Sequence, residues 1–459
     1  MSFIEIGENM GIEFTYFQPL YGAQNSFIYL LTAIVFLLAV ISLIKGHFDV
    51  LNPSFIYSIC LAGCCFLAAL YAKKWDMPMH FNSAIIIIIM SILLLLGGSL
   101  ADYCCHQYTA ISLKKQKSQQ GFFISKSLWV VFMMILVYLG YLNYTDILSA
   151  ASEITNETEF KKILLPVINS LNHHEIELSR WNAYRTRFAT IMAYLSTMAI
   201  WLNLTAHQYK EALKWGCFIL AYIPFIIFTG GRQQFMYLIM FALVSFFLVH
   251  RKSHNKSSLA NEFVIIGIAV AVFLFCFLGA GIFNGKIGSD SGFLQILVHY
   301  AGTNISAFDV YVNEMIIPDT QYIGASTFDN IYGFLYARGL DVPPFIQYIT
   351  LFTAFGPVTT NVYTAFYRYI NDFGYFGCAL VIFLIGFFYT FLYRQLYHHG
   401  LKNWMILIYA SIIYPVFLMG REERFFNEIL TTSKISFIVG LLILYKFFEL
   451  LNERRSNVK

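Results

Sequence analysis

Several arginines lie where an apolar run of the chain ends or begins. In FTGGRQQFM, Phe228–Met236, Arg232 follows two glycines, and in GREERFFNE, Gly420–Glu428, Arg421 and Arg424 flank two glutamates. A guanidinium group can hold a phosphate or a carboxylate through two parallel hydrogen bonds. These arginines are therefore candidate ligands for an anion. A lipid headgroup contact or a surface ion pair would explain the same residues without a specific function.

Two side chains in another segment have the chemistry of a general base. The segment HYAGTNISAFDVYVNE, His299–Glu314, contains His299 and Asp309, and either group can accept a proton from a reacting hydroxyl. Tyr300 beside them is a candidate sugar-binding residue. A hydrogen-bonded structural histidine and an aspartate that pairs with an arginine are the alternative explanations.

A third segment combines aromatic and charged residues. NVYTAFYRYINDFGYFG, Asn361–Gly377, contains Tyr363 and Tyr367, whose rings could stack on a sugar, together with Arg368 and Asp372. An aromatic belt at the membrane–water interface would explain the tyrosines. It would not explain an arginine among them. Arg368 is therefore a candidate anion ligand, and Asp372 and the tyrosines are candidate sugar ligands.

The sequence offers no metal or nucleotide site. One group of possible metal ligands exists, but no further ligand pair has a spacing typical of zinc; the group is His173, His174, Glu175 and Glu177. The chain has neither a phosphate-binding loop, nor a dinucleotide-binding glycine motif, nor HExxH. Nearly all of the eight cysteines lie in or beside apolar runs and are interpreted as packing residues. We expect a site without metal or cofactor, and no nucleic-acid partner.

The elements that must position these residues are membrane-spanning helices. The chain is 58% hydrophobic and 12% charged, against roughly 25% charged residues in a soluble protein. Several apolar runs approach the ~20 residues that cross a bilayer. We predict an all-α polytopic membrane protein, one integral membrane domain over residues 1–459, with about eleven spans and ten to twelve possible. The spans are predicted at about 26–44, 53–72, 82–103, 122–144, 187–206, 213–229, 234–250, 262–283, 375–393, 404–419 and 434–450.

Charges in the connections predict the orientation. Alternate connections are short and rich in lysine, as in Lys114, Lys115 and Lys117, and the positive-inside rule makes them cytoplasmic. Lys73 and Lys74 then fall outside, against that rule. The outer set holds two large loops, 145–186 and 284–374, and most of the arginines. Among the outer arginines are Arg180, Arg232, Arg338, Arg368, Arg421 and Arg424.

The second large loop is rich in apolar and aromatic residues rather than in proline, glycine and serine. It contains FLQILVHYAGTNISAFDVYV, STFDNIYGFLYARGL and PPFIQYITLFTAFG. A structureless loop of this length would be unusual in a compact protein. We predict short amphipathic helices that pack on the outer mouth of the helix bundle.

Four segments together resemble a known family. In order, FTGGRQQF, HYAGTNISAFDVYV, YIGASTFDNIYGFL and TNVYTAFYRYINDFGYFG resemble bacterial O-antigen polymerases, the Wzy-type oligosaccharide repeat-unit polymerases. The resemblance covers roughly residues 215–450 and is most specific in the last two segments. Some members carry an arginine followed eleven residues later by glycine in both large outer loops, and no outer-loop arginine here does. No catalytic role is transferred from that pattern.

The resemblance implies a glycosyltransferase of the bacterial inner membrane, with a GT-C-like helical architecture and a site facing the periplasm. Its donor would be a glycan on undecaprenyl diphosphate, and its acceptor a newly delivered repeat unit on the same lipid. A chain-length regulator protein and membrane lipids would be its partners. On this chemistry the arginines would hold the diphosphate, and His299 or Asp309 would serve as the base.

Two other functions remain open. An O-antigen ligase would share the donor and the helical fold but would pass the glycan to the lipid A core; the segment NVYTAFYRYINDFG favours the polymerase. A flippase or transporter of lipid-linked oligosaccharide would also use arginine for the diphosphate. It would place charges at the middle of the membrane and show repeat symmetry, whereas these charges cluster at the outer ends of the predicted spans.

Overall fold

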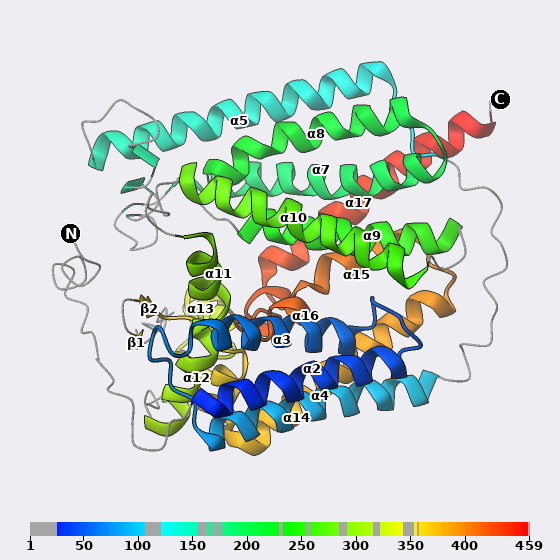
Figure 1. The fold of residues 1–459 in the computed structure, drawn as a ribbon. Helices are drawn as coiled ribbons and strands as arrows, with labels where there is room; N and C mark the ends of the chain where they lie inside the picture. Colours follow the sequence, from blue (N-terminus) through cyan, green and yellow to red (C-terminus); the bar gives the residue numbers. More distant parts are fainter. Residues whose placement is uncertain are drawn as a thin grey trace. The chain divides into compact units, whose positions relative to one another are not determined.

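The described residues of the chain form mostly α-helices in a computed structural model (Figure 1). The structure describes residues 25–105, 121–154, 163–164, 166–167, 170, 176, 178–228, 233–253, 258–283, 292–314, 322–342, 353–355 and 358–457. Within them, ten helices are long and apolar enough to cross a membrane. These helices are α2 Asn25–Lys45, α3 Pro53–Tyr71, α4 Phe81–Cys105, α5 Lys126–Ile154, α7 Arg180–Thr205, α8 Tyr209–Phe228, α9 Gln233–Ser253, α10 Leu259–Phe283, α14 Phe366–His398 and α17 Thr432–Asn457.

Every predicted span falls on a helix, so the polytopic helical class is confirmed. The span predicted at 404–419 is broken into two shorter helices, α15 Asn403–Ile412 and α16 Tyr414–Leu418. Helices are the form that apolar runs of this length adopt in lipid, because a helix satisfies its backbone hydrogen bonds within one segment.

The chain divides into two compact units. Unit 1 comprises Met1–Ala110, Gly292–Gln395 and Pro415–Lys434, and unit 2 comprises Ile111–Ser291, Leu396–Tyr414 and Ile435–Lys459. Each unit has its own apolar spans. Unit 1 contains α2, α3, α4 and most of α14, and unit 2 contains α5, α7, α8, α9, α10, α15 and most of α17.

Short elements gather at one end of the unit 1 spans (Figure 1). They are the helices α11 Phe293–Ala301, α12 Thr303–Glu314 and α13 Asp329–Tyr336 and the strands β1 Thr353–Phe355 and β2 Val358–Thr360. The π-helix η2 Phe425–Ile429 contacts α13. The three short α-helices fall within the loop predicted to contain such helices. The two strands pair antiparallel, Thr353 opposite Thr360, and depart from the purely helical expectation. Their threonine, phenylalanine and valine residues suit an extended backbone.

Glycines let two spans of unit 1 touch backbone to backbone. A Cβ added to Gly97 of α4 would overlap the carbonyl oxygen of Phe383 in α14, and one added to Gly386 of α14 would overlap the carbonyl oxygen of Leu94. Small residues at matching positions permit this close approach between membrane helices. The two glycines are therefore required by the packing of α4 on α14.

Helix α14 is interrupted near its beginning. Gly374 has φ 66° and ψ −176°, a conformation outside the helical region. Glycine adopts it without the steric cost that a Cβ adds. The turns Phe366–Phe373 thus form a separate first segment, and they carry Arg368 and Asp372.

Unit 2 is held by helix packing and a few buried polar contacts. Helix α7 packs on α8 and α9, and α10 and α15 pack on α9. Arg251 and Glu262 form a buried ion pair between α9 and α10, with 3.0 Å between Nη2 and Oε1. The amide of Asn203 accepts from the backbone N–H of Phe122 and donates to its carbonyl, which satisfies the chain just before α5.

Candidate functional site

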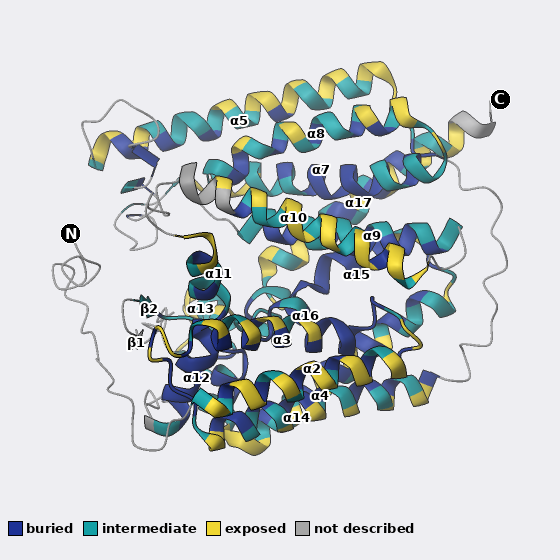
Figure 2. Cartoon of the chain, in the orientation of Figure 1, coloured by how far each residue is buried: buried dark blue, intermediate teal, exposed yellow. Residues whose placement is uncertain are grey.

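Helix α12 is the buried centre of the connections in unit 1 (Figure 2). Residues 303–312 are all buried, and the helix packs on α3, α4, β1 and β2. A helix buried on every side carries few polar residues unless they have partners. Asn304 and Asp309 are two such residues, with exposed fractions of 1% and 0%. Their partners are the most informative contacts of the site.

Asp309 pairs with His80, which lies just before α4. Its Oδ1 accepts from the backbone N–H of His80 at 2.7 Å, and its Oδ2 lies 2.8 Å from His80 Nδ1. Asn313, one turn along α12, donates its Nδ2 to the Asp309 carbonyl at 2.8 Å. The carboxylate therefore fixes both the backbone and the ring of His80.

The contact also fixes the protons of the ring. An ionised carboxylate only accepts hydrogen bonds, so Nδ1 must carry a hydrogen in the pair with Asp309. In the neutral ring, Nε2 is then left with its lone pair. This Nε2 is buried and has no hydrogen-bond partner among the described residues, although 13% of the side chain is exposed.

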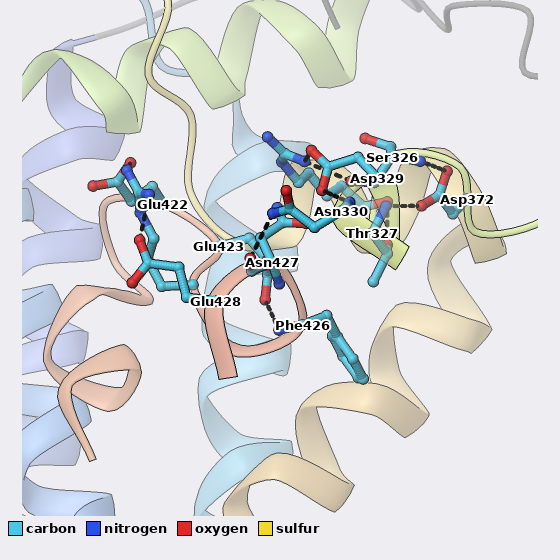
Figure 3. A network of polar contacts seen from close by, with 12 residues as sticks. Ser326, Thr327, Asp329, Asn330, Asp372, Glu422, Glu423, Phe426, Asn427 and Glu428 are labelled. Carbon is cyan, nitrogen blue, oxygen red and sulfur yellow. Dashed lines mark hydrogen bonds and ion pairs between the residues drawn. The ribbon is translucent and has the colours of Figure 1, made fainter. Parts of the chain in front are cut away.

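A second group of contacts joins Ser326–Asn330, here called the STFDN segment, to the first turns of α14. The carboxylate of Asp372 accepts from the backbone N–H groups of Ser326 at 3.1 Å and Thr327 at 2.5 Å. One turn earlier, Arg368 Nη1 donates to the Ser326 carbonyl at 2.5 Å and to Asp329 Oδ2 at 2.7 Å. Figure 3 shows Ser326 and Thr327 beside Asp372. Arg368 and Asp372, which carry opposite charges, thus both bind the STFDN segment: the guanidinium group donates to it and the carboxylate accepts from its backbone.

The turn Gly420–Glu428, here called the arginine turn, contains a compact set of ion pairs. Glu422 contacts both Arg421, at 3.1 Å between Nη1 and Oε1, and Arg424. Arg424 also pairs with Glu428 at 2.6 Å. Burial disfavours the ionised form of Glu422, but the guanidinium groups of Arg421 and Arg424 outweigh it and lower the pKa of Glu422. Glu422 therefore remains a carboxylate between two cations.

Glu423 has the opposite electrostatic balance. It accepts from the N–H groups of Phe426 at 2.7 Å and Asn427 at 3.2 Å, and from the Tyr369 hydroxyl at 3.0 Å. These bonds satisfy the beginning of η2. Burial nevertheless raises the pKa of Glu423 above its ordinary value. Two adjacent glutamates thus differ in how readily they lose a proton, because only Glu422 contacts two arginines.

Helix α12 connects these groups. Asn304 donates to the Gly420 carbonyl of the arginine turn. The ring of Phe308 lies 6.0 Å from that of Phe366, and the ring of Tyr311 lies 4.6 Å from that of Tyr367. The STFDN segment reaches the arginine turn through Asn330, which donates to the Asn427 carbonyl at 2.6 Å. The His80–Asp309 pair, the STFDN segment and the arginine turn all belong to unit 1.

The arginines of this site are already neutralised. Arg368, Arg421 and Arg424 each contact a carboxylate. The carboxylates of the network outnumber the arginines, and they are Asp329, Asp372, Glu422, Glu423 and Glu428. A phosphate would bind here only by taking the place of a carboxylate. Glu422 is the obvious one, because it holds the position between two guanidinium groups that a phosphate oxygen would occupy.

Five of the predicted site residues belong to this network, and they are Asp309, Arg368, Asp372, Arg421 and Arg424. Other predicted residues of unit 1 lie apart from its ion pairs. Tyr363 and Tyr367 are buried with their ring centres 4.8 Å apart, which is a packing contact. The rings of His299 and Tyr300, on the last turn of α11, are 5.1 Å apart.

The remaining predicted arginines lie elsewhere. Arg338, just after α13, is exposed and lies over the Phe334 ring at 3.3 Å. Arg180 is the exposed first residue of α7 in unit 2. Arg232 lies outside the described residues. The roles assigned to all of these residues stay predictions.

Sequence reasoning missed five titratable residues of these contacts: His80, Asp329, Glu422, Glu423 and Glu428. From the sequence, Glu422 and Glu423 are interpretable only as possible partners of Arg421 and Arg424. His80 gave one usable signal, since it precedes an apolar run at the end predicted to face outward. Nothing in the sequence links it to Asp309, which is 229 residues away.

No protein-family model, curated protein or solved structure matches this chain. Among the described residues, no group of three or more histidine, cysteine, aspartate or glutamate side chains could hold a metal ion. The function is therefore inferred from the residues and their contacts.

Proposed function

We propose that this chain is a membrane glycosyltransferase that polymerises undecaprenyl-diphosphate-linked repeat units into O-antigen or a related surface polysaccharide. The observation that carries the proposal is the joining of Arg368, Arg421 and Arg424 in one polar network at the end of a set of apolar spans. Arg368 stands in TNVYTAFYRYINDFGYFG, one of the two most specific segments of the resemblance. The protein would act in the bacterial inner membrane with this network facing the periplasm.

The proposed reaction needs cations for its leaving group. The growing glycan leaves undecaprenyl diphosphate when the acceptor hydroxyl attacks its first sugar, and negative charge develops on the diphosphate. Fixed guanidinium groups in a partly buried site stabilise such charge more strongly than water-exposed ones. Lipid tails would remain among the apolar spans while the sugars meet the polar connections. A chain-length regulator is the expected protein partner.

A deletion strain that produces lipopolysaccharide tests the proposal. Removal of this chain should leave lipopolysaccharide with single-unit caps, and the wild-type chain should restore the ladder of long glycans. Bare core in the deletion strain would instead identify a ligase. Repeat units that accumulate on the cytoplasmic face would identify a flippase. Either result would overturn the polymerase proposal.

The arginine network has its own test. R368A and R421A should each reduce the ladder to short chains at unchanged protein level, because each removes a cation from the leaving group. R187A is the matched control, since Arg187 belongs to unit 2 and donates to Ser436 rather than to the network. Full-length ladders from both network variants would rule out their role in the reaction.

A further inference from the structure

We propose that His80, oriented by Asp309, is the general base that takes the proton from the acceptor hydroxyl. This inference rests on the proposed function and assigns the base within the same unit. It changes the role of Asp309 from base to positioning residue. His80 was not among the residues that the sequence singled out.

The geometry points to His80 rather than to Asp309 itself. Asp309 is fully buried, and its two carboxylate oxygens are engaged by the backbone N–H and by Nδ1 of His80. A base must reach the proton that it removes, at about 2.6–3.2 Å between heavy atoms. The Asp309 side chain is closed off from any other molecule and accepts from His80 and Asn313, whereas 13% of the His80 side chain is exposed.

The Nε2 atom is the part of His80 that lacks an explanation within the fold. Buried polar atoms almost always have a hydrogen-bond partner, and a lone acceptor without one costs free energy. Asp309 keeps Nε2 unprotonated in the neutral ring, so the missing partner must be a donor. A sugar hydroxyl is such a donor. It is also the group that must lose a proton in the proposed reaction.

The surroundings hold the ring in place. The His80 carbonyl accepts from the N–H of Ala84 at 3.2 Å, so His80 begins the hydrogen bonding of α4. Asn313 links α12 to the same turn by donating to Ser83 Oγ at 3.0 Å. A base held at its backbone, at Nδ1 and through its neighbours loses little orientation before the reaction.

The step balances without a metal or a cofactor. The acceptor O–H bond breaks as its proton moves to His80 Nε2, and the oxygen forms a bond to the anomeric carbon of the donor. The bond from that carbon to the diphosphate oxygen breaks, and its electron pair leaves with undecaprenyl diphosphate. The imidazolium, stabilised by Asp309, then returns the proton to water.

Three variants test the proposal, and each removes the function of the base in a different way. In D309N, the amide oxygen can still accept from the His80 N–H while the amide nitrogen donates to Nδ1, which moves the ring hydrogen to Nε2 and blocks the base. H80A removes the base and leaves space for imidazole. H80Q keeps a polar side chain of similar length but supplies no base. We expect each to slow elongation by about 10²–10⁴-fold.

The assay uses the purified full chain in lipid nanodiscs. Its substrate is lipid-linked single repeat units extracted from the deletion strain, and product is measured as glycan chain length over time. Added imidazole should restore H80A by at least about tenfold and should not restore D309N, whose own ring occupies the place. H399Q is the matched control, because His399 is exposed and belongs to unit 2, and it should elongate like the wild type.

The possible failures are distinct. A wild-type chain that never elongates these units would remove the proposed function, and the base with it. A wild-type chain that elongates, together with H80A or D309N of equal rate, would remove only the base. If H80A does not fold, H80Q and D309N decide the matter, since each keeps a polar side chain at both position 80 and position 309. Rescue of H80A and D309N alike by imidazole would also contradict the proposal.

Discussion

At the scale of single residues, the most informative side chain is Glu422, because its carboxylate lies against two arginines, where a phosphate group could also bind. Its carboxylate contacts Arg421 and Arg424, and their positive charges keep it ionised despite burial. Under the proposed function, this carboxylate would keep the two guanidinium groups from repelling each other before a diphosphate binds, and the diphosphate would then replace it.

This exchange predicts the behaviour of E422Q. The variant should be less stable than the wild type without ligand, because Arg421 loses its carboxylate partner and Arg424 keeps only its pair with Glu428. Inorganic pyrophosphate should then raise its thermal midpoint in detergent more than that of the wild type. E449Q is the control, since Glu449 pairs with Lys446 on α17 in unit 2. Equal pyrophosphate shifts in all three proteins would exclude an anion site at the arginine turn.

A prediction for Arg368 depends on the shape of its guanidinium group rather than on its charge. Its guanidinium group holds the Ser326 carbonyl and Asp329 together, and an ammonium group lacks this planar fork. R368K should therefore weaken the STFDN segment by about 1.5–3 kcal/mol and shorten the glycan ladder.

The control for R368K is R394K. Arg394 pairs with Asp102 at 2.6 Å in the same unit but outside the network. R394K should leave the ladder at full length when protein levels are matched. A full ladder from R368K as well would show that only the charge at position 368 matters.

At the scale of elements, η2 depends on a glutamate that resists ionisation. Because the pKa of Glu423 is raised in the folded chain, the folded state holds its proton more tightly than the unfolded state does. Its contribution to stability is complete below the ordinary glutamate pKa and is lost as pH rises through the raised value. Glu422, with a lowered pKa, contributes the opposite dependence.

E423Q should therefore change the pH profile of stability. The amide carries no charge at any pH, so the thermal midpoint of E423Q relative to the wild type should increase as the pH rises from about 5 to about 8. The measurement is a thermal melt of detergent-solubilised protein at each pH. A constant difference between the two proteins across that range would contradict the raised pKa.

The interruption of α14 gives another prediction at this scale. At φ 66° and ψ −176°, Gly374 occupies a region that residues with a Cβ avoid, so G374A should cost about 1–3 kcal/mol of stability. It should also disturb Arg368 and Asp372, which lie on the segment before the interruption. The control is G63A in α3, where an added Cβ meets nothing within 4 Å. Equal thermal midpoints for G374A and the wild type would show that the interruption is not required.

The sequence predicted the helices better than their ends. Apolar runs identified the ten helices of the described residues that are long enough to cross a membrane, since a span of the membrane must be long and apolar, whereas the eleventh predicted span, 404–419, is broken into two short helices. The end of α5 was predicted at 144 and lies at Ile154, and the start of α14 was predicted at 375 and lies at Phe366. In α5, Asp146 lowers the hydropathy of the extension while the backbone remains helical. In α14, the turns before 375 carry Arg368 and are set apart from the rest of the helix by the interruption at Gly374.

The contacts of the site were predictable only in part. Residue type identified Arg368, Asp372, Arg421 and Arg424, because charged groups beside apolar runs are unusual. Their partners depend on how distant segments pack, and the sequence carries no signal for that. The His80–Asp309 pair joins the start of α4 to α12 and is visible only in three dimensions.

At the scale of the whole molecule, orientation is the prediction to test first. If the network faces the periplasm, as the proposed function requires, the connection 72–80 should lie in the periplasm and the connection 46–52 in the cytoplasm. Alkaline phosphatase fused after Asp76 should be active, and the same enzyme fused after Gly46 should be inactive. Lys73 and Lys74 make this a demanding test, because the positive-inside rule favours the reverse. The reverse activity pattern would turn the network toward the cytoplasm and exclude a periplasmic polymerase.

The glycine contact between α4 and α14 has a mechanical consequence for unit 1. Helix α4 begins directly after His80, and α14 begins with the turns that carry Arg368 and Asp372. Gly97 and Gly386 bring the two backbones together without intervening side chains. We therefore expect the two helices to move as one rigid body rather than to slide or separate. A lipid-linked substrate that enters sideways would have to pass another pair of helices. The start of α4, and with it the proposed base, would then keep its position relative to the long part of α14 that follows Gly374.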